Sequence, residues 1–403
     1  MRGPTDHPNA RLFTPAFIAL SLAELAYFTA AGLTIPVTPL FAHGPLGADS
    51  FGVGLVVGAF SVTALILRPF AGRMTDRWGR RPPLVLGALA CAIVLAAHGL
   101  AGDLAVLIVL RLLLGVAEAF FFVAAFAAVA DLAPPGRAGE ALSFNSLSLY
   151  LGIALGPLLG HWLLDAGGFG LAWTGGAALA LIAAVLALRL PETSRRAEDV
   201  AARTRSRAIL HPAAIAPSLV LFAAIAGMGG FFAFVAIYAT EDLGLDGSSG
   251  VLLLFGAIVV VTRILFARLP DQVPPFRLGA VALGLCATGL AVTGSVQSVA
   301  GLLVGAALLA VGVAFTTPAV FAAIFARVPP SERGAASGTA SLFIDLGFGG
   351  GPMLLGIVAG SAGIGAAFIV AGIVAGLGAA GSALLAVGRG LGRSYERVEV
   401  TTN

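Results

Sequence analysis

Long apolar stretches follow one another along almost the whole chain and constrain its fold more than any other feature. A helix needs about 20 apolar residues to cross the hydrocarbon core of a bilayer. Twelve stretches come close to this length, with approximate limits 14–41, 51–71, 83–102, 104–131, 138–164, 169–189, 212–239, 248–266, 277–296, 299–327, 334–360 and 363–388. We therefore predict an all-α membrane protein with twelve transmembrane helices.

The composition excludes a soluble globular protein. Hydrophobic residues make up 59% of the chain and charged residues 11%, against about 45–50% and about 25% in soluble domains. All 23 basic residues are arginines, which with the abundant Ala and Gly indicates GC-rich codons and a bacterial source. The net charge of +3 belongs to arginines on one side of a membrane, so we expect no nucleic-acid partner. Cys91 and Cys286 lie within apolar stretches, where a buried small side chain is a better interpretation than a disulfide or metal ligand.

The arginines alternate between the connections. They occur before the first stretch, after the last, and in the connections 2–3, 4–5, 6–7, 8–9 and 10–11, while the other connections contain none. Because arginine-rich connections stay in the cytoplasm, we predict that both termini are cytoplasmic and that the protein lies in a bacterial inner membrane. The long polar connection 189–211 is interpreted as a linker, and its charges can also contact anionic membrane lipids.

The two halves of the chain are related by a shift of 195 residues. The shift places Arg68 on Arg263, Asp76 on Asp271 and Cys91 on Cys286. A parallel repeat of this kind implies two bundles related by an axis along the membrane normal, with a ligand site between them near the midplane. The predicted organisation is a cytoplasmic N-terminus (1–13), a first six-helix bundle (14–189), a cytoplasmic linker (190–211), a second six-helix bundle (212–388) and a cytoplasmic tail (389–403).

Four ionisable residues lie deep within the predicted spans. Glu24, Glu118, Asp345 and Arg111 are candidate proton-coupling residues, because ionisable groups in hydrocarbon are costly and usually mark function. Arg111 and Glu118 are seven residues apart and share one face of their helix. The alternative for each carboxylate is a satisfied polar contact between helices.

The connection Arg68–Arg81 reads RPFAGRMTDRWGRR and concentrates five arginines around a single carboxylate, Asp76. Gly72 and Gly79 permit a tight reversal or a close backbone approach. One interpretation is a positively charged loop that only sets topology. The residue order also resembles the signature loop of the major facilitator superfamily, whose fold would comprise two pseudo-twofold-related six-helix bundles.

Two further motifs carry the same resemblance. The sequence R-L-L-L-G at 111–115 is similar to the motif of helix 4, whose arginine is implicated in proton coupling. The sequence G-I-A-L-G-P-L-L-G at 152–160 resembles the helix-5 motif of proton-antiporting exporters, and its matching residues are Gly152, Gly156, Pro157 and Gly160. From the residues alone, these glycines indicate close helix packing.

The resemblance also implies a cytoplasmic gate. Its residues here would be Gly72, Asp76, Arg77, Gly79, Arg80 and Asp131, with Asp271 from the second-half copy. In the family this gate stabilises the outward-open state. Phe121, Phe122, Phe231 and Phe232 are candidates for an aromatic substrate cavity, and ordinary interhelical packing is the alternative for each of them.

The predicted function is proton-coupled export of a lipophilic or aromatic drug-like compound or secondary metabolite by alternating access. A proton-symporting importer of a sugar or organic acid and a transport-inactive receptor or scaffold are alternatives. The chain contains no H-E-x-x-H, G-x-S-x-G or P-loop motif, so we predict no enzyme activity. The expected coupling ion is the proton, with no cofactor or metal, and the expected partners are a small-molecule substrate and membrane lipids around a monomer.

Overall fold

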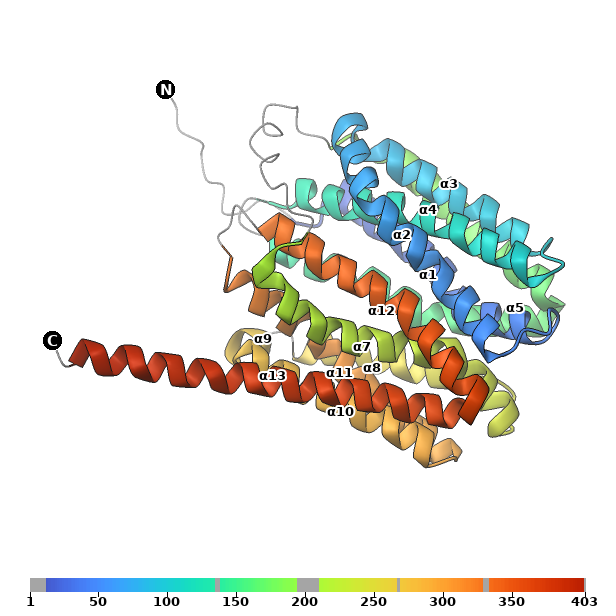
Figure 1. Cartoon of the computed structure of the whole chain (residues 1–403). Coiled ribbons are helices and arrows are strands. Elements are labelled where there is room, and N and C mark those ends of the chain that lie inside the picture. The colour runs from blue at the N-terminus through green and yellow to red at the C-terminus, as the bar shows by residue number, and fades with distance from the viewer. Residues whose placement is uncertain (1–11, 135–137, 194–209, 267–268, 329–332, 402–403) are drawn as a thin grey trace, which may run out of the picture.

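The computed structural model describes residues 12–134, 138–193, 210–266, 269–328 and 333–401. All regular secondary structure in these residues is helical, in agreement with the predicted all-α class (Figure 1). The helices are α1 (Pro15–His43), α2 (Ser50–Trp78), α3 (Arg81–His98), α4 (Leu104–Leu132), α5 (Ala138–Leu188), α7 (Pro212–Ile237), the short π-helix η1 (Tyr238–Asp242), α8 (Ser249–Leu265), α9 (Leu269–Gln272), α10 (Pro275–Ser295), α11 (Val299–Phe325), α12 (Arg333–Ala362) and α13 (Ile364–Thr401).

Two helices, α5 and α8, differ in length from a single predicted membrane span. α5 contains two straight segments, because the backbone leaves helical geometry at Gly167 and at Gly168, whose φ is 69°. α8 has 17 residues, which corresponds to about 25 Å at 1.5 Å per residue. Ten described helices are long and apolar enough to cross a membrane. With α5 counted as two spans and α8 added, the described helices are consistent with the predicted twelve.

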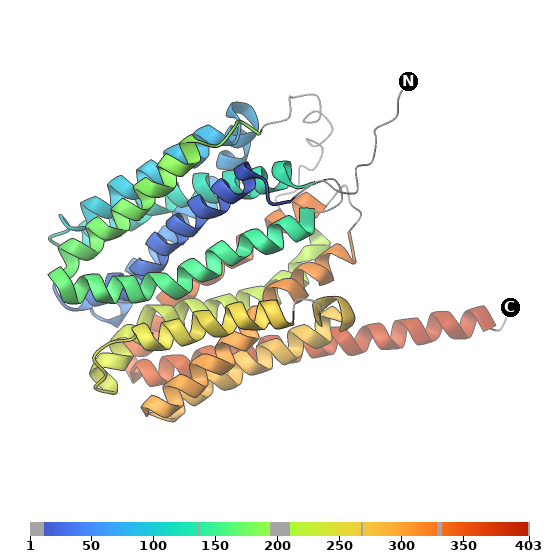
Figure 2. The same ribbon diagram turned by 180° about the vertical axis from the view of Figure 1, so that it is seen from behind.

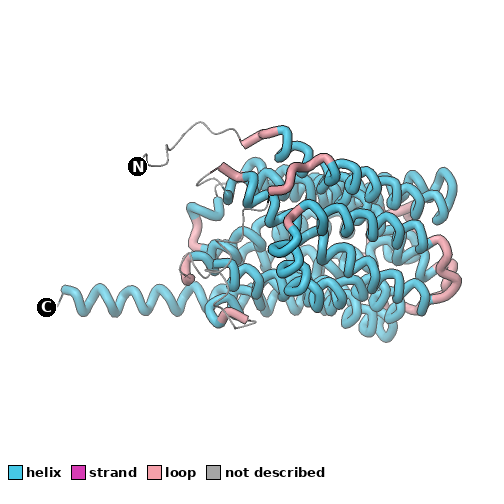
Figure 3. The backbone as a smooth tube through the Cα atoms, turned by 90° about the horizontal axis from the view of Figure 1, so that it is seen from above, coloured by secondary structure: helices cyan, strands magenta, loops and turns pink. Residues whose placement is uncertain are grey.

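The bundle has two ends, which we name by the connections that lie there. At the linker end α2 ends, α3 begins and α7 begins. At the far end α1, α3 and α7 finish (Figure 1). α13 continues as a helix past the other elements at the linker end. Figure 3 shows the described connections as short segments at the two ends of the helices.

Acidic and hydroxyl side chains start several helices at the far end. The Asp49 carboxylate accepts a hydrogen bond from the backbone N–H of Gly52 at 2.7 Å, and Asp103 accepts from Val106 at 2.9 Å. A side-chain acceptor at this position satisfies one of the free N–H groups of the first turn and favours the positive end of the helix dipole. Capping therefore explains the positions of Asp49 and Asp103 in connections without arginine.

The predicted connection Arg68–Arg81 is wrong over most of its length. α2 continues as a helix to Trp78, so Gly72 lies inside a helix and makes no reversal. The chain turns at Gly79, which has a φ of 92°, and α3 begins at Arg81. Arginine and methionine are good helix formers, so this stretch carries the helix onward until a glycine with left-handed geometry ends it.

Each half of the chain packs its helices through glycines. The glycines of the helix-5 motif lie against α1: a Cβ on Gly156 would lie 2.5 Å from the backbone nitrogen of Leu33 and 2.6 Å from the carbonyl oxygen of Thr29. The equivalent glycine of the second half, Gly351, lies against Ala226 of α7 in the same way. These positions show the close helix approach that the motif predicts from its residues alone.

The two halves meet along two seams. The α2–α12 seam is formed where Gly58 faces Gly349 and Met353, and the α5–α8 seam is formed where Gly256 faces Ala154. Figures 1 and 2 show α12 beside α2 from one side and α8 beside α5 from the other. Further contacts join the halves at the far end, where the His43 ring lies 2.9 Å from the Glu241 carboxylate. The described contacts between the halves therefore run from the far end to the middle of the helices.

Candidate functional site

An arginine and two carboxylates from three helices form a charged cluster where the two halves meet. The Arg68 Nη2 of α2 donates a hydrogen bond to Asp345 Oδ1 of α12 at 2.7 Å, and its Nε lies 2.6 Å from Oδ2. Glu118 of α4 places Oε1 4.0 Å from the same Nη2. The ring of Phe122 lies 4.4 Å from the guanidinium carbon. We call Arg68, Glu118 and Asp345 the acidic clasp.

The acidic clasp is shielded from solvent. The side chains of Arg68 and Asp345 are 14% and 5% exposed, and that of Glu118 is 24% exposed. When both carboxylates are ionised the cluster carries one negative charge in excess, and one bound proton makes it neutral. Charges of this kind inside a membrane are expensive unless they are paired. The arrangement can therefore hold a proton while it joins the two halves.

Two of the predicted proton-coupling residues thus share a partner that sequence reasoning missed. Arg68 was assigned to the arginine-rich connection, because it begins the run RPFAGRMTDRWGRR at the end of the apolar stretch 51–71. The structure instead places Arg68 within α2, ten residues before the helix ends. The available signal was its repeat partner Arg263, which indicated that an arginine at this depth occurs in both halves.

Arg111 makes a different set of contacts. Its Nε donates to the carbonyl oxygen of Val56 at 3.1 Å and its Nη2 to that of Val57 at 3.3 Å. The guanidinium carbon lies 4.9 Å from the ring centre of Phe60, and a Cβ on Gly115 would collide with the Phe60 carbonyl group. In the helix-4 motif, Arg111 therefore hydrogen-bonds to the backbone of α2 and Gly115 packs closely against it. Arg111 has no described ion pair with Glu118, although the two share a helix.

Glu24 belongs to a separate contact between α1 and α5. Its Oε2 accepts a hydrogen bond from the Asn145 side-chain amide, and Asn145 also lies within hydrogen-bonding distance of Ser21, at 3.4 Å. Glu24 is buried, and its Oε1 has no described hydrogen-bond partner. The contact lies within the first half, so Glu24 does not take part in the seam between the halves.

A second polar cluster lies at the linker end of the first half. Arg80 Nε donates to Asp131 Oδ2 at 2.9 Å, and its Nη1 donates to the carbonyl oxygen of Thr75 at 2.9 Å. Glu192 accepts hydrogen bonds from the backbone N–H groups of Arg80 at 2.7 Å and Arg81 at 3.2 Å. These contacts connect α2, α3, α4 and the segment after α5. Glu192 was not among the predicted gate residues.

The other predicted gate residues differ in how far the structure describes them. Gly79 forms the reversal, and a Cβ there would collide with the Glu192 carboxylate. Arg77 is exposed. Gly72 has open space around it, since the nearest atom to a Cβ there is 4.0 Å away. The side chains of Asp76 and Asp271 lie outside the described part of the structure.

The predicted aromatic residues separate into two groups. Phe121 is fully buried and stacks on Tyr27 with ring centres 3.8 Å apart. Phe231 and Phe232 are also buried, against other aromatic rings of the second half. Phe122 alone of the four lies beside the acidic clasp. The buried three occupy packed interior positions in this structure.

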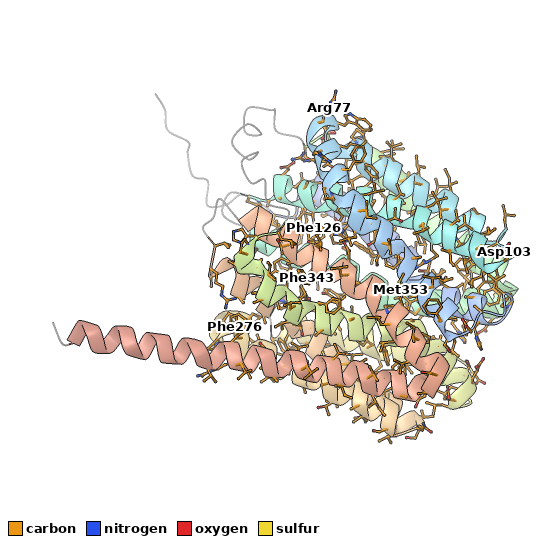
Figure 4. The ribbon with its side chains drawn as sticks, in the orientation of Figure 1. Arg77, Asp103, Phe126, Phe276, Phe343 and Met353 are labelled. Atoms are coloured by element: carbon orange, nitrogen blue, oxygen red, sulfur yellow. The ribbon has the colours of Figure 1, made fainter. Side chains whose placement is uncertain are left out.

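Aromatic residues continue the face of α4 that carries Glu118. Glu118, Phe122 and Phe126 recur every four residues, so they share one side of the helix. Phe122 and Phe126 stack with ring centres 4.5 Å apart. Figure 4 labels Phe126 on α4 and Phe343 on α12, both in the part of the bundle toward the linker end. Sequence reasoning had not singled out Phe126.

Comparison with known proteins identifies the class to which this chain belongs. The sequence profile described as Major Facilitator Superfamily matches residues 20–299. The chain is 28% identical to multidrug resistance protein 1 of Bacillus subtilis over 86% of this chain and 88% of that protein. It is 30% identical to a transporter of Burkholderia mallei described as MFS-type and uncharacterized, over 87% and 86% of the two chains.

Solved structures show the same fold. A bacterial homologue of the human lysosomal transporter Spinster, in an inward-facing and occupied conformation, superposes with a TM-score of 0.74 at 17% identity, over 91% of this chain and 95% of that one. A human organic anion transporter superposes with a TM-score of 0.67 at 22% identity, over 92% and 100% of the two chains.

The protein is thus a multi-pass membrane transporter rather than an enzyme, as predicted. It belongs to the major facilitator superfamily, and this confirms the predicted fold class.

Proposed function

We propose that the protein is a proton-coupled exporter of lipophilic or aromatic compounds, located in a bacterial inner membrane with its linker end in the cytoplasm. The acidic clasp carries this proposal, because it places two carboxylates and one arginine inside the membrane at the contact between the two halves. The likeness to a relative named for multidrug resistance supports the direction and the class of substrate. The expected coupling ion is the proton and the expected working unit is a monomer surrounded by lipid.

The clasp links the contact between the two halves to a proton. With both carboxylates ionised, Arg68 holds α12 against α2 and keeps the far end closed, so an empty carrier stays open toward the linker end. A proton on Asp345 removes one partner of the ion pair, and Arg68 retains Glu118 at 4.0 Å as its counter-ion. The seam can then part. The arginine thus passes from one carboxylate to the other, and the bound proton makes the cluster neutral.

The substrate would meet the aromatic face of α4. Phe122 and Phe126 follow Glu118 on that face, and Phe126 is 40% exposed. An aromatic compound can stack on these rings within reach of the clasp. Replacement of either ring by alanine should therefore raise KM for an aromatic substrate about tenfold. Phe120→Ala is the matched control, because Phe120 contacts Phe70 on another side of the helix.

Transport in inverted membrane vesicles tests the coupling. Acidification of the vesicle interior should drive accumulation of a fluorescent aromatic cation such as ethidium, and an uncoupler should abolish it. Asp345→Asn and Glu118→Gln should each lose the dependence on the pH gradient, while Asp165→Asn, which removes an exposed far-end carboxylate, should behave as wild type. Accumulation that ignores the gradient in the wild-type protein, or full coupling in both carboxylate variants, would contradict the proposal.

A further inference from the structure

The second seam carries a contact that is the repeat counterpart of the acidic clasp. Arg263 of α8 donates from Nη2 to the hydroxyl of Tyr150 on α5, and its guanidinium carbon lies 4.0 Å from the Tyr150 ring centre. The shift of 195 residues that places Arg68 on Arg263 also places Tyr150 on Asp345. In each half, an arginine of the second helix therefore binds the fifth helix of the other half. We call Arg263 and Tyr150 the phenolic clasp.

The helices of the two seams also pack in the same register, because equivalent residues of the repeat meet in both. The same shift places Ser61 on Gly256 and Ala154 on Gly349. A Cβ on Gly349 would lie 3.1 Å from the Ser61 Cβ, and a Cβ on Gly256 would lie 2.6 Å from the Ala154 Cα. On α12 and α5 this close approach lies four residues after the clasp residue, Asp345 or Tyr150. On α2 and α8 it lies seven residues before the clasp arginine. The two clasps therefore occupy equivalent places, one turn of α12 or α5 from this contact and toward the linker end.

Chemistry separates the two clasps. The shift places Glu118 on Val313, a buried apolar residue of α11. The α5–α8 seam thus has a phenol where the α2–α12 seam has Asp345, and an aliphatic side chain where that seam has Glu118. Among the described contacts Arg263 has Tyr150 as its partner, and its Nε has no hydrogen bond. The acidic clasp can exchange a proton between two carboxylates, and the phenolic clasp has no carboxylate.

The described surroundings add no further charged or titratable group around Asp345, whereas Arg111, Tyr27 and Cys91 also lie near Glu118. α12 packs on α2, α7, α11 and α13. α7, α11 and residues 364–388 of α13 contain no charged residue and no histidine or tyrosine. The charged and titratable groups that face Asp345 are therefore Arg68 from α2 and Glu118 from α4. Within the α2–α12 seam a response to pH is therefore assigned to the clasp; the His43–Glu241 contact also joins the halves, but between α1 and η1.

We propose that Arg263 and Tyr150 are positioning residues of the transport cycle, which hold α8 on α5 without a carboxylate while protonation releases α12 from α2. The inference rests on the proposed proton coupling. The two halves then part unevenly: the α2–α12 seam responds to the proton, and the α5–α8 seam acts as the pivot. The repeat places an arginine contact at the same position in each seam. Because one contact has Asp345 and the other has Tyr150, only the first can respond to a proton between pH 8 and pH 5.

Distances across each seam test this directly. Spin labels at the exposed far-end positions Phe51 and Ser361 report the α2–α12 seam, and labels at Asp165 and Gly250 report the α5–α8 seam. Both pairs are measured in the full-length protein in lipid nanodiscs, with the two native cysteines replaced by alanine. Between pH 8 and pH 5 the first pair should lengthen and the second should stay constant.

Variants of the clasps sharpen the test. Asp345→Asn should remove the pH response of the first pair. Tyr150→Asp introduces a carboxylate into the phenolic clasp and should make the second pair lengthen at acid pH as well. Tyr150→Phe keeps the ring but removes the hydroxyl acceptor, so it should lower transport about tenfold at every pH without a change in the shape of the pH profile. If Tyr150→Asp does not fold, Tyr150→Phe decides.

The outcomes separate this inference from the proposed function. Proton-coupled transport by a protein in which both seams lengthen together would overturn the inference and leave the function intact. Seams that respond unevenly in a protein whose transport ignores the pH gradient would leave the inference and refute the function. A flattened pH profile in Tyr150→Phe would also overturn the inference, because it would assign the proton response to the phenolic clasp.

Discussion

The sharpest prediction concerns the unequal consequences of removing either partner of the acidic clasp. Arg68→Gln leaves Glu118 and Asp345 facing each other without a cation, at side-chain exposures of 24% and 5%. Asp345→Asn leaves Arg68 with Glu118 at 4.0 Å and with an amide oxygen that still accepts a hydrogen bond. The two single substitutions break the same ion pair, but only the first leaves uncompensated charge inside the membrane.

The expected costs follow from this difference. Removal of one partner of a buried ion pair costs about 3–5 kcal/mol when the remaining charge has no other partner, which is the case for Arg68→Gln. Asp345→Asn should cost about 1–2 kcal/mol, because it weakens one charge-assisted hydrogen bond and leaves a counter-ion. In the double variant position 345 carries no charge, so the double variant should cost about 2 kcal/mol less than the sum of the single costs.

Equilibrium unfolding in mixed micelles, titrated with a denaturing detergent at pH 8, measures these free energies. Arg73→Gln is the matched control, since Arg73 is an exposed arginine of the same helix, and it should change the free energy of unfolding by less than about 0.5 kcal/mol. At pH 5 the cost of Arg68→Gln should shrink, because a protonated carboxyl needs no cation. Equal costs for the two single variants, or strict additivity in the double variant, would refute the reasoning.

Two further predictions concern glycines and have internal controls. Gly58→Ala should open the α2–α12 seam, because its Cβ would collide with a facing backbone carbonyl of α12, whereas Gly350→Ala has open space; thiol labelling of far-end cysteines measures the opening, and equal labelling in the two variants would contradict it. Gly79→Ala and Gly47→Ala both impose a positive φ on alanine, at 92° and 61°, and each should cost about 1–2 kcal/mol. Gly79→Ala should cost more in unfolding measurements, because its Cβ also collides with Glu192; equal costs would show that this carboxylate moves aside freely.

Hydropathy and charge were sufficient to predict the helices and their class. The apolar stretches fall on α1 to α13 because a bilayer-spanning helix needs an uninterrupted apolar length, which is a local property of the sequence. The same reasoning placed the end of the second span near residue 71, whereas α2 continues to Trp78. Hydropathy reports where the membrane ends, and helix propensity reports where the helix ends, so the two limits differ wherever a helix extends into water.

The partners within the site could not be predicted in the same way. Asp345 and Glu118 were identified by their depth, but Arg68 is separated from Asp345 by 277 residues, and only the packing of the halves brings them together. The repeat contained the missing information, since one shift relates both arginines and both of their partners. Phe121 was predicted from the cluster of phenylalanines near Glu118 to line a substrate cavity. Its stacking on Tyr27 places it in the packed interior instead.

The glycine-lined seams have a consequence for how the molecule opens. Where Gly58 faces Gly349 and Gly256 faces Ala154, the surfaces in contact consist largely of backbone and small side chains, with Met353 as the long apolar side chain at the first of these contacts. Separation of such flat faces requires little rearrangement of side chains, so the apolar contact should do little to slow the separation of the halves. The rate of each transport cycle would then depend on the few polar atoms at the edge of the interface, where the binding of a single proton changes the interaction between the halves.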